Sequence, residues 1–64
     1  MKWELKRDAT GWPWMDSTTH TIAKYGREKS DYLLFRKRGD RVAQVVRVVT
    51  ADEVARALQD DWTP

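Results

Sequence analysis

Two stretches near the middle of the chain alternate apolar and polar residues in the manner of paired β-strands. Residues 31–38 and 41–49 are rich in β-branched and aromatic side chains, and Gly39-Asp40 separates them. Glycine at the first central position is typical of a two-residue type II′ turn. The pattern therefore predicts a β-hairpin whose tip is Gly39-Asp40.

A two-residue turn sets Arg38 opposite Arg41 and divides the hairpin into two faces. The first face is apolar and suited to being covered by a helix. Its members are Leu33, Phe35, Val42, Val46 and Val48. The second face is basic and surrounds Leu34 and Val45. Its members are Tyr32, Arg36, Arg38, Arg41 and Arg47. A slip of one residue would mix arginine with valine, which favours this register.

The C-terminal residues begin with the signature of a helix start. Thr50 and Glu53 form a capping box, in which each side chain accepts a hydrogen bond from the backbone N–H of the other residue. We expect the helix to continue to about residue 60, with an apolar stripe at every fourth position. The stripe consists of Val54, Leu58 and Trp62. It is expected to cover the apolar face of the hairpin.

The N-terminal segment alternates charged and apolar residues over positions 2–7. This alternation predicts a short strand with Trp3 and Leu5 on one face. Residues 8–16 contain Gly11 and Pro13 and are expected to form a loop.

Residues 17–25 are open to two interpretations. Their threonine content favours a strand, whereas a cap at residue 16 or 17 and a stop at Gly26 would suit a helix. We favour the strand, with a turn at residues 26–30. The predicted fold class is α+β, in which a small antiparallel sheet of three to four strands carries one C-terminal α-helix on one face. Residues 1–64 are expected to form a single small domain.

Composition narrows the possible sources of stability. With 41% hydrophobic and 34% charged residues, the 64-residue chain has the composition of a folded protein. It contains no cysteine and hence no disulfide, so we expect so small a domain to be stabilised by dense packing of its four Trp, two Tyr and one Phe or by self-association, such as a homodimer. The N-terminal residues lack the apolar run of a signal peptide, and no segment resembles a membrane span. We therefore expect a cytoplasmic protein with no membrane partner.

The charge distribution makes nucleic acid the favoured partner. The net charge is only +2, but residues 1–49 hold eleven basic and six acidic residues. Arginines of the predicted basic face could bind phosphate or guanine, and Tyr32 could stack on a base. The same face could also be merely a solvated one. A three-stranded sheet followed by a helix is similar to the arm-binding domains of phage-type recombinases, a resemblance that implies DNA binding.

The alternative partner is a protein. Trp12 and Trp14 flank Pro13, and in an extended segment both side chains would point to the same side. They could hold a peptide or close one end of the core. This pair, together with an exposed strand edge, would suit a small inhibitor or adaptor of the kind that phages and other mobile elements carry.

Catalytic chemistry finds little support in the sequence. His20 is the single histidine, and with Asp16 it supplies too few ligands for a zinc site. We expect no catalytic residue, no metal and no cofactor. The sequence thus favours a non-enzymatic binding module, with DNA as the first candidate partner.

Overall fold

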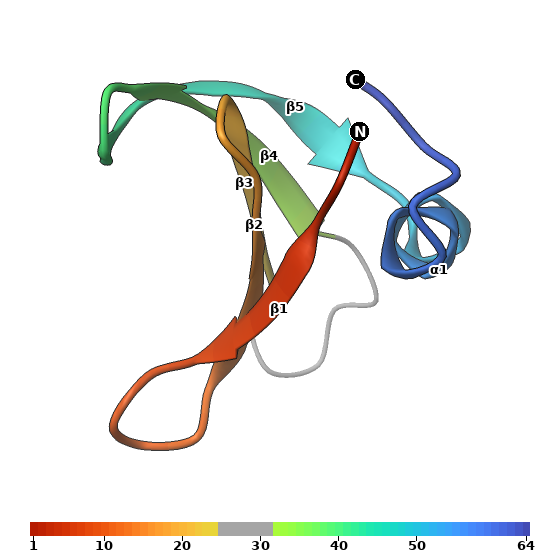
Figure 1. Ribbon diagram of the computed structural model, residues 1–64, viewed down its shortest axis with the longest axis horizontal. Helices are drawn as coiled ribbons and strands as arrows, with labels where there is room; N and C mark the ends of the chain where they lie inside the picture. Colours follow the sequence, from red (N-terminus) through yellow and green to blue (C-terminus); the bar gives the residue numbers. More distant parts are fainter. Residues whose placement is uncertain (25–31) are drawn as a thin grey trace.

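The computed structural model describes residues 1–24 and 32–64. In these residues a five-stranded antiparallel sheet in the order β1-β2-β3-β4-β5 is followed by one helix (Figure 1). The strands are β1 (Glu4–Arg7), β2 (Pro13–Asp16), β3 (His20–Lys24), β4 (Tyr32–Arg38) and β5 (Arg41–Val49), and the helix is α1 (Ala51–Leu58). The predicted antiparallel sheet with a C-terminal helix is confirmed, but five strands replace the expected three to four. The turn expected at residues 26–30 lies outside the described residues.

The additional strand comes from a segment that was expected to be a loop. Pro13 opens β2, a position where the missing backbone N–H of proline costs a sheet little. Met15 pairs with Leu5 on one side and with Ile22 on the other, and it is buried. Burial of this side chain between two neighbouring strands outweighs the local turn signals. Strand β3 settles the other open point, since His20–Lys24 forms a strand and not a helix.

The β4–β5 hairpin has the predicted turn but not the predicted register. Gly39 has a φ of 66°, the left-handed value that a type II′ turn needs at its first central position, and Arg38 pairs with Arg41. Two register shifts follow in β5, between Leu34 and Phe35 and between Arg36 and Lys37 on the β4 side. Each sets one extra β5 residue against the β4 strand, as a β-bulge does.

The sheet has one covered face and one uncovered face. The covered face, here called the core face, carries a row in which Leu34 pairs with Ile22 and Ile22 pairs with Met15. The opposite face, here called the open face, carries Leu33 and Phe35. Helix α1 lies against the core face, because its Ala57 is fully buried in one cluster with the row. The expectation that the helix covers Leu33 and Phe35 is therefore wrong.

The predicted apolar stripe of the helix is also corrected. Helix α1 ends at Leu58, whose side chain is 56% exposed, while Ala57 is the buried residue of the helix. Trp62 lies beyond the helix and is buried by a reversal of the chain, which Asp60 permits with a φ of 55°. Asp60 and Trp62 therefore lie in the segment that follows the helix, and the turn at Asp60, not a helical repeat, places Trp62 in the core.

The two ends of the chain close the core together (Figure 1). Trp3 is buried, and its indole Nε1–H donates to the carbonyl of Trp62 at 3.1 Å. The two indole rings lie 5.9 Å apart between centroids, a spacing typical of aromatic pairs. The backbone N–H of Trp3 also donates to the Asp60 carboxylate at 3.0 Å.

The predicted capping box is confirmed. The Thr50 hydroxyl accepts from the Glu53 backbone N–H at 3.2 Å, and the Glu53 carboxylate accepts from the Thr50 backbone N–H at 3.1 Å. Both donors belong to the unpaired first turn of a helix, so the two bonds fix where α1 starts.

Candidate nucleic-acid interface

All five residues of the predicted basic face lie on one face of the β4–β5 hairpin. Strand alternation places Tyr32, Arg36 and Arg38 on the core face, and pairing places Arg41 and Arg47 beside them. However, α1 covers part of this core face, at the end of the hairpin where β4 begins. The five residues are consequently divided between a covered end and a free end.

At the covered end, Arg47 is held by the rest of the protein. Its guanidinium forms a salt bridge with Glu53 at 2.9 Å and lies 5.7 Å from the centre of the Trp62 ring. The hydrogen bond from Arg47 and that from the Thr50 backbone hold the pKa of the Glu53 carboxyl below its usual value. Arg47 therefore joins β5 to the helix start, a structural role that the sequence did not reveal.

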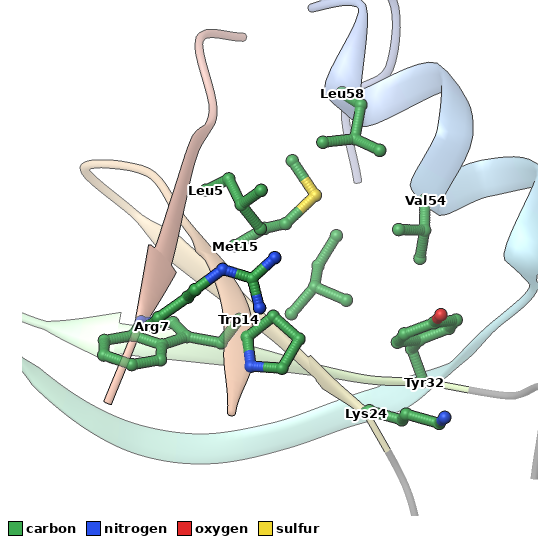
Figure 2. A pocket seen from close by; sticks show the side chains of 10 residues that line it. Leu5, Arg7, Trp14, Met15, Lys24, Tyr32, Val54 and Leu58 are labelled. Carbon is green, nitrogen blue, oxygen red and sulfur yellow. The ribbon is translucent and has the colours of Figure 1, made fainter. Parts of the chain in front are cut away.

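Tyr32 is likewise half-buried and packs against the core. It borders a groove of about 220 Å³ between the sheet and α1 (Figure 2). Met15 and Ile22 line this groove from the sheet, and Val54 and Leu58 line it from the helix. Tyr32 is thus separated from the arginines at the hairpin tip.

At the free end, three arginines remain together. Arg36, Arg38 and Arg41 are all exposed on the same face of the hairpin. The ion pairs of residues 1–24 and 32–64 involve Asp16 and Glu53, and none includes these three arginines. Figure 1 shows their tip at the end of the hairpin opposite to α1. We call Arg36, Arg38 and Arg41 the tip cluster.

Two polar neighbours of the tip cluster were not foreseen from the sequence. Pairing places His20 of β3 on one side of Arg36 and Gln44 of β5 on the other. Burial and the nearby Arg36 charge lower the pKa of His20, so both favour the uncharged form of its ring. Thr19 Oγ1 lies 2.8 Å from His20 Nδ1. His20 lies beside Arg36 because β3 is the neighbour of β4 in the sheet. Gln44 lies beside Arg36 because of the register shift in β5.

The open face carries a partly buried charge network at one end. Asp16 binds Lys37 at 3.0 Å and Lys6 at 3.2 Å. Burial acts to raise the pKa of Asp16, but hydrogen bonds from Lys37 and Thr21 outweigh it and lower that pKa. The positive charge of Lys37 is consequently paired with the Asp16 carboxylate, and Lys37 is not part of the tip cluster.

The two tryptophans of the protein-binding alternative occupy different environments. Trp12 lies in the loop between β1 and β2, where the Asp8 carboxylate accepts from its backbone N–H at 2.9 Å, and its side chain is 38% exposed. Trp14 is half-buried on β2, where it pairs with Lys6 and Ala23 and borders the groove.

The described residues provide no cluster of three or more histidine, aspartate or glutamate side chains arranged to hold a metal ion. Helix α1 has eight residues and falls far short of the length and apolar character that a membrane crossing requires; the described chain has no other helix.

Comparisons with protein families, with curated proteins and with solved structures find no match to this chain.

Proposed function

We propose that this protein is a non-enzymatic module that binds the backbone of duplex DNA through the tip cluster. The observation that carries the proposal is the direct cross-strand pairing of Arg38 with Arg41, next to Arg36. Like charges opposite each other destabilise a hairpin, so a bound polyanion would relieve a cost that the free protein bears.

The shape of the hairpin supports the same partner. A two-stranded antiparallel ribbon fits the major groove of DNA, and arginine side chains form paired hydrogen bonds with phosphate or with guanine. The tip cluster lies at the end of such a ribbon and away from α1 (Figure 1). The exposed Gln44, beside Arg36, adds an amide that can bind a base edge or a phosphate oxygen.

The salt dependence of binding to a labelled duplex tests the proposal. Each phosphate contact releases about one counterion, so replacing Arg36, Arg38 or Arg41 by alanine should lower the slope of log affinity against log salt by about one. Fluorescence anisotropy measures this slope. Asp40→Asn should strengthen binding, because it removes the negative charge from the turn.

Arg56→Ala is the matched control, since it removes one exposed positive charge from α1 and leaves the hairpin intact. It should leave the slope unchanged. Equal losses from Arg56→Ala and Arg38→Ala would mean that only net charge matters. Absence of binding at low salt would end the proposal, and single-stranded RNA run in parallel would reveal a preference for RNA.

Protein binding is the second candidate function, and the groove favours it. Trp14 and Tyr32 border an apolar groove. The half-exposed Trp12 lies in the β1–β2 loop, two residues before Trp14. Aromatic side chains at the rim of a groove are enriched at protein-binding sites. A protein that lacks DNA affinity but loses its partner on substitution of Trp12 would support this alternative.

A further inference from the structure

The groove between the sheet and α1 has an apolar floor (Figure 2). This floor is the row in which Leu5 pairs with Met15 and Met15 pairs with Ile22. Val54 and Leu58 of α1 line the groove from the other side. The groove therefore offers an apolar molecule contacts from both layers of the protein.

The next row of the sheet gives the groove a cationic end. Arg7 lies two residues after Leu5 in β1, and it pairs with Pro13. Lys24 lies two residues after Ile22 in β3. Strand alternation therefore places both cations on the face of the groove, and both line it. Because β2 separates β1 from β3, the backbones that carry them are about 10 Å apart.

Arg7 is held in place but keeps donors for a ligand. Its Nη1 donates to the carbonyl of Gly11 in the β1–β2 loop at 3.0 Å. A guanidinium has several further N–H donors in a fixed fork, and these can bind a carboxylate. Figure 2 shows the side chain extending from β1 toward the other residues that line the groove.

The charge of the groove is of one sign. None of the described residues that line it is acidic. The two acids nearest to Arg7 along the chain are directed elsewhere. The Asp8 carboxylate accepts from the backbone N–H of Trp12 at 2.9 Å, and Glu4 alternates onto the open face, where it pairs with Asp16. Charge complementarity therefore selects an anion with an apolar tail as the occupant of the groove.

We propose that the groove binds a small carboxylic acid with an unbranched apolar tail, its carboxylate between Arg7 and Lys24 and its tail on the apolar floor. The volume sets the length of the tail. At about 30 Å³ for each water, a groove of about 220 Å³ holds about seven waters. About seven methylene groups, each close to a water in size, fit in their place, and a drug-sized ligand does not.

Octanoate is the probe, and NMR spectra of the methyl groups locate it. Titration should shift the methyl signals of Met15, Ile22 and Val54 and leave the backbone signals of the tip cluster in place. Affinity should rise from butanoate through hexanoate to octanoate, by about threefold for each added methylene group. The gain should end at longer tails, which the groove cannot hold. Octylammonium has the same tail and the opposite charge, and it should bind at least about tenfold more weakly than octanoate.

Arg7→Gln should lower the affinity for octanoate by about tenfold, because it removes a charged hydrogen-bond donor. Arg56→Gln is the matched control, since it removes an equal charge from the exposed side of α1 and does not line the groove. It should leave the affinity unchanged. Equal losses from the two variants would overturn the proposal. Because the comparison of octanoate with octylammonium uses the unaltered protein, equal affinities there would overturn it whether or not the variants fold.

The proposal does not depend on DNA binding, because the tip cluster lies at the end of the hairpin opposite to α1 (Figure 1). Arg38→Ala should weaken DNA binding and leave octanoate binding intact. Shifts confined to the tip cluster during the octanoate titration would overturn the proposal. A groove that ignores octanoate but binds an apolar peptide would overturn it as well, in favour of a protein partner.

Discussion

A pair of leucine-to-alanine substitutions measures which side of the hairpin holds the core. Leu34 is fully buried in the row with Ile22 and Met15, whereas the Leu58 side chain is 56% exposed on α1. The two substitutions remove the same atoms. Any difference between them therefore reports the burial of the side chain and not its chemistry.

The structure gives the expected size of each effect. Removing a fully buried leucine side chain costs about 2–5 kcal/mol, because a cavity is left in addition to the lost burial. Leu58→Ala leaves no enclosed cavity and should cost less than about 1 kcal/mol. A 64-residue domain has a total stability of only about 3–10 kcal/mol, so Leu34→Ala should bring it close to unfolding.

Urea denaturation followed by tryptophan fluorescence is a suitable assay, because the buried Trp3 and Trp62 report on the core. At a slope of about 1 kcal/mol per molar urea, Leu34→Ala should lower the midpoint by about 2 M or more. Both variants must be measured at one protein concentration, since self-association would add to stability. Leu34→Val, with an expected cost of about 1 kcal/mol, serves if the alanine variant does not fold.

Equal midpoints for the two alanine variants would refute the assignment of the core. A larger loss from Leu58→Ala would restore the arrangement that the sequence predicted, in which Leu58 packs on the Phe35 side of the hairpin. Either result would contradict the placement of Leu34 in the core and of Leu58 at the surface.

Two further predictions concern local features. Thr50→Ala removes the hydroxyl that accepts from the Glu53 backbone N–H, so it should cost about 1 kcal/mol and lower the melting temperature; an unchanged melting curve would show that Thr50 does not cap the helix. Asp16 has a lowered pKa in the folded protein, so its contribution to stability is present above its unfolded pKa of 3.8 and is lost as the pH falls below that value. As the pH is lowered past 3.8, the urea midpoint of Asp16→Asn should drop less steeply than that of the unaltered protein. Parallel pH profiles of the two proteins would contradict the role assigned to the carboxylate.

The sequence alone determined the features that depend on neighbouring residues. Glycine is the residue that readily adopts the positive φ at position 39, so the hairpin tip could be located. Thr50 and Glu53 satisfy each other's backbone donors three residues apart, so the helix start could be located too. The arginines of the hairpin sort onto one face because the repeat of a strand is two residues, and this part of the candidate site was also predictable.

The tertiary structure alone decided which face became the core and which arginines stayed free. Leu34 is buried because Ile22 and Met15 fall beside it across three strands, a row that inspection of the hairpin by itself cannot reveal. Because the face with Leu34 became the core face, α1 packs on the face that also carries the arginines. Glu53 of α1 forms a salt bridge with Arg47 there, whereas the tip cluster lies beyond the helix and is exposed. The bulges of β5 then moved Val45 to the open face. Burial of apolar surface from distant segments contributes more free energy than the local preferences it overrides, and its outcome depends on pairings that are remote in the sequence.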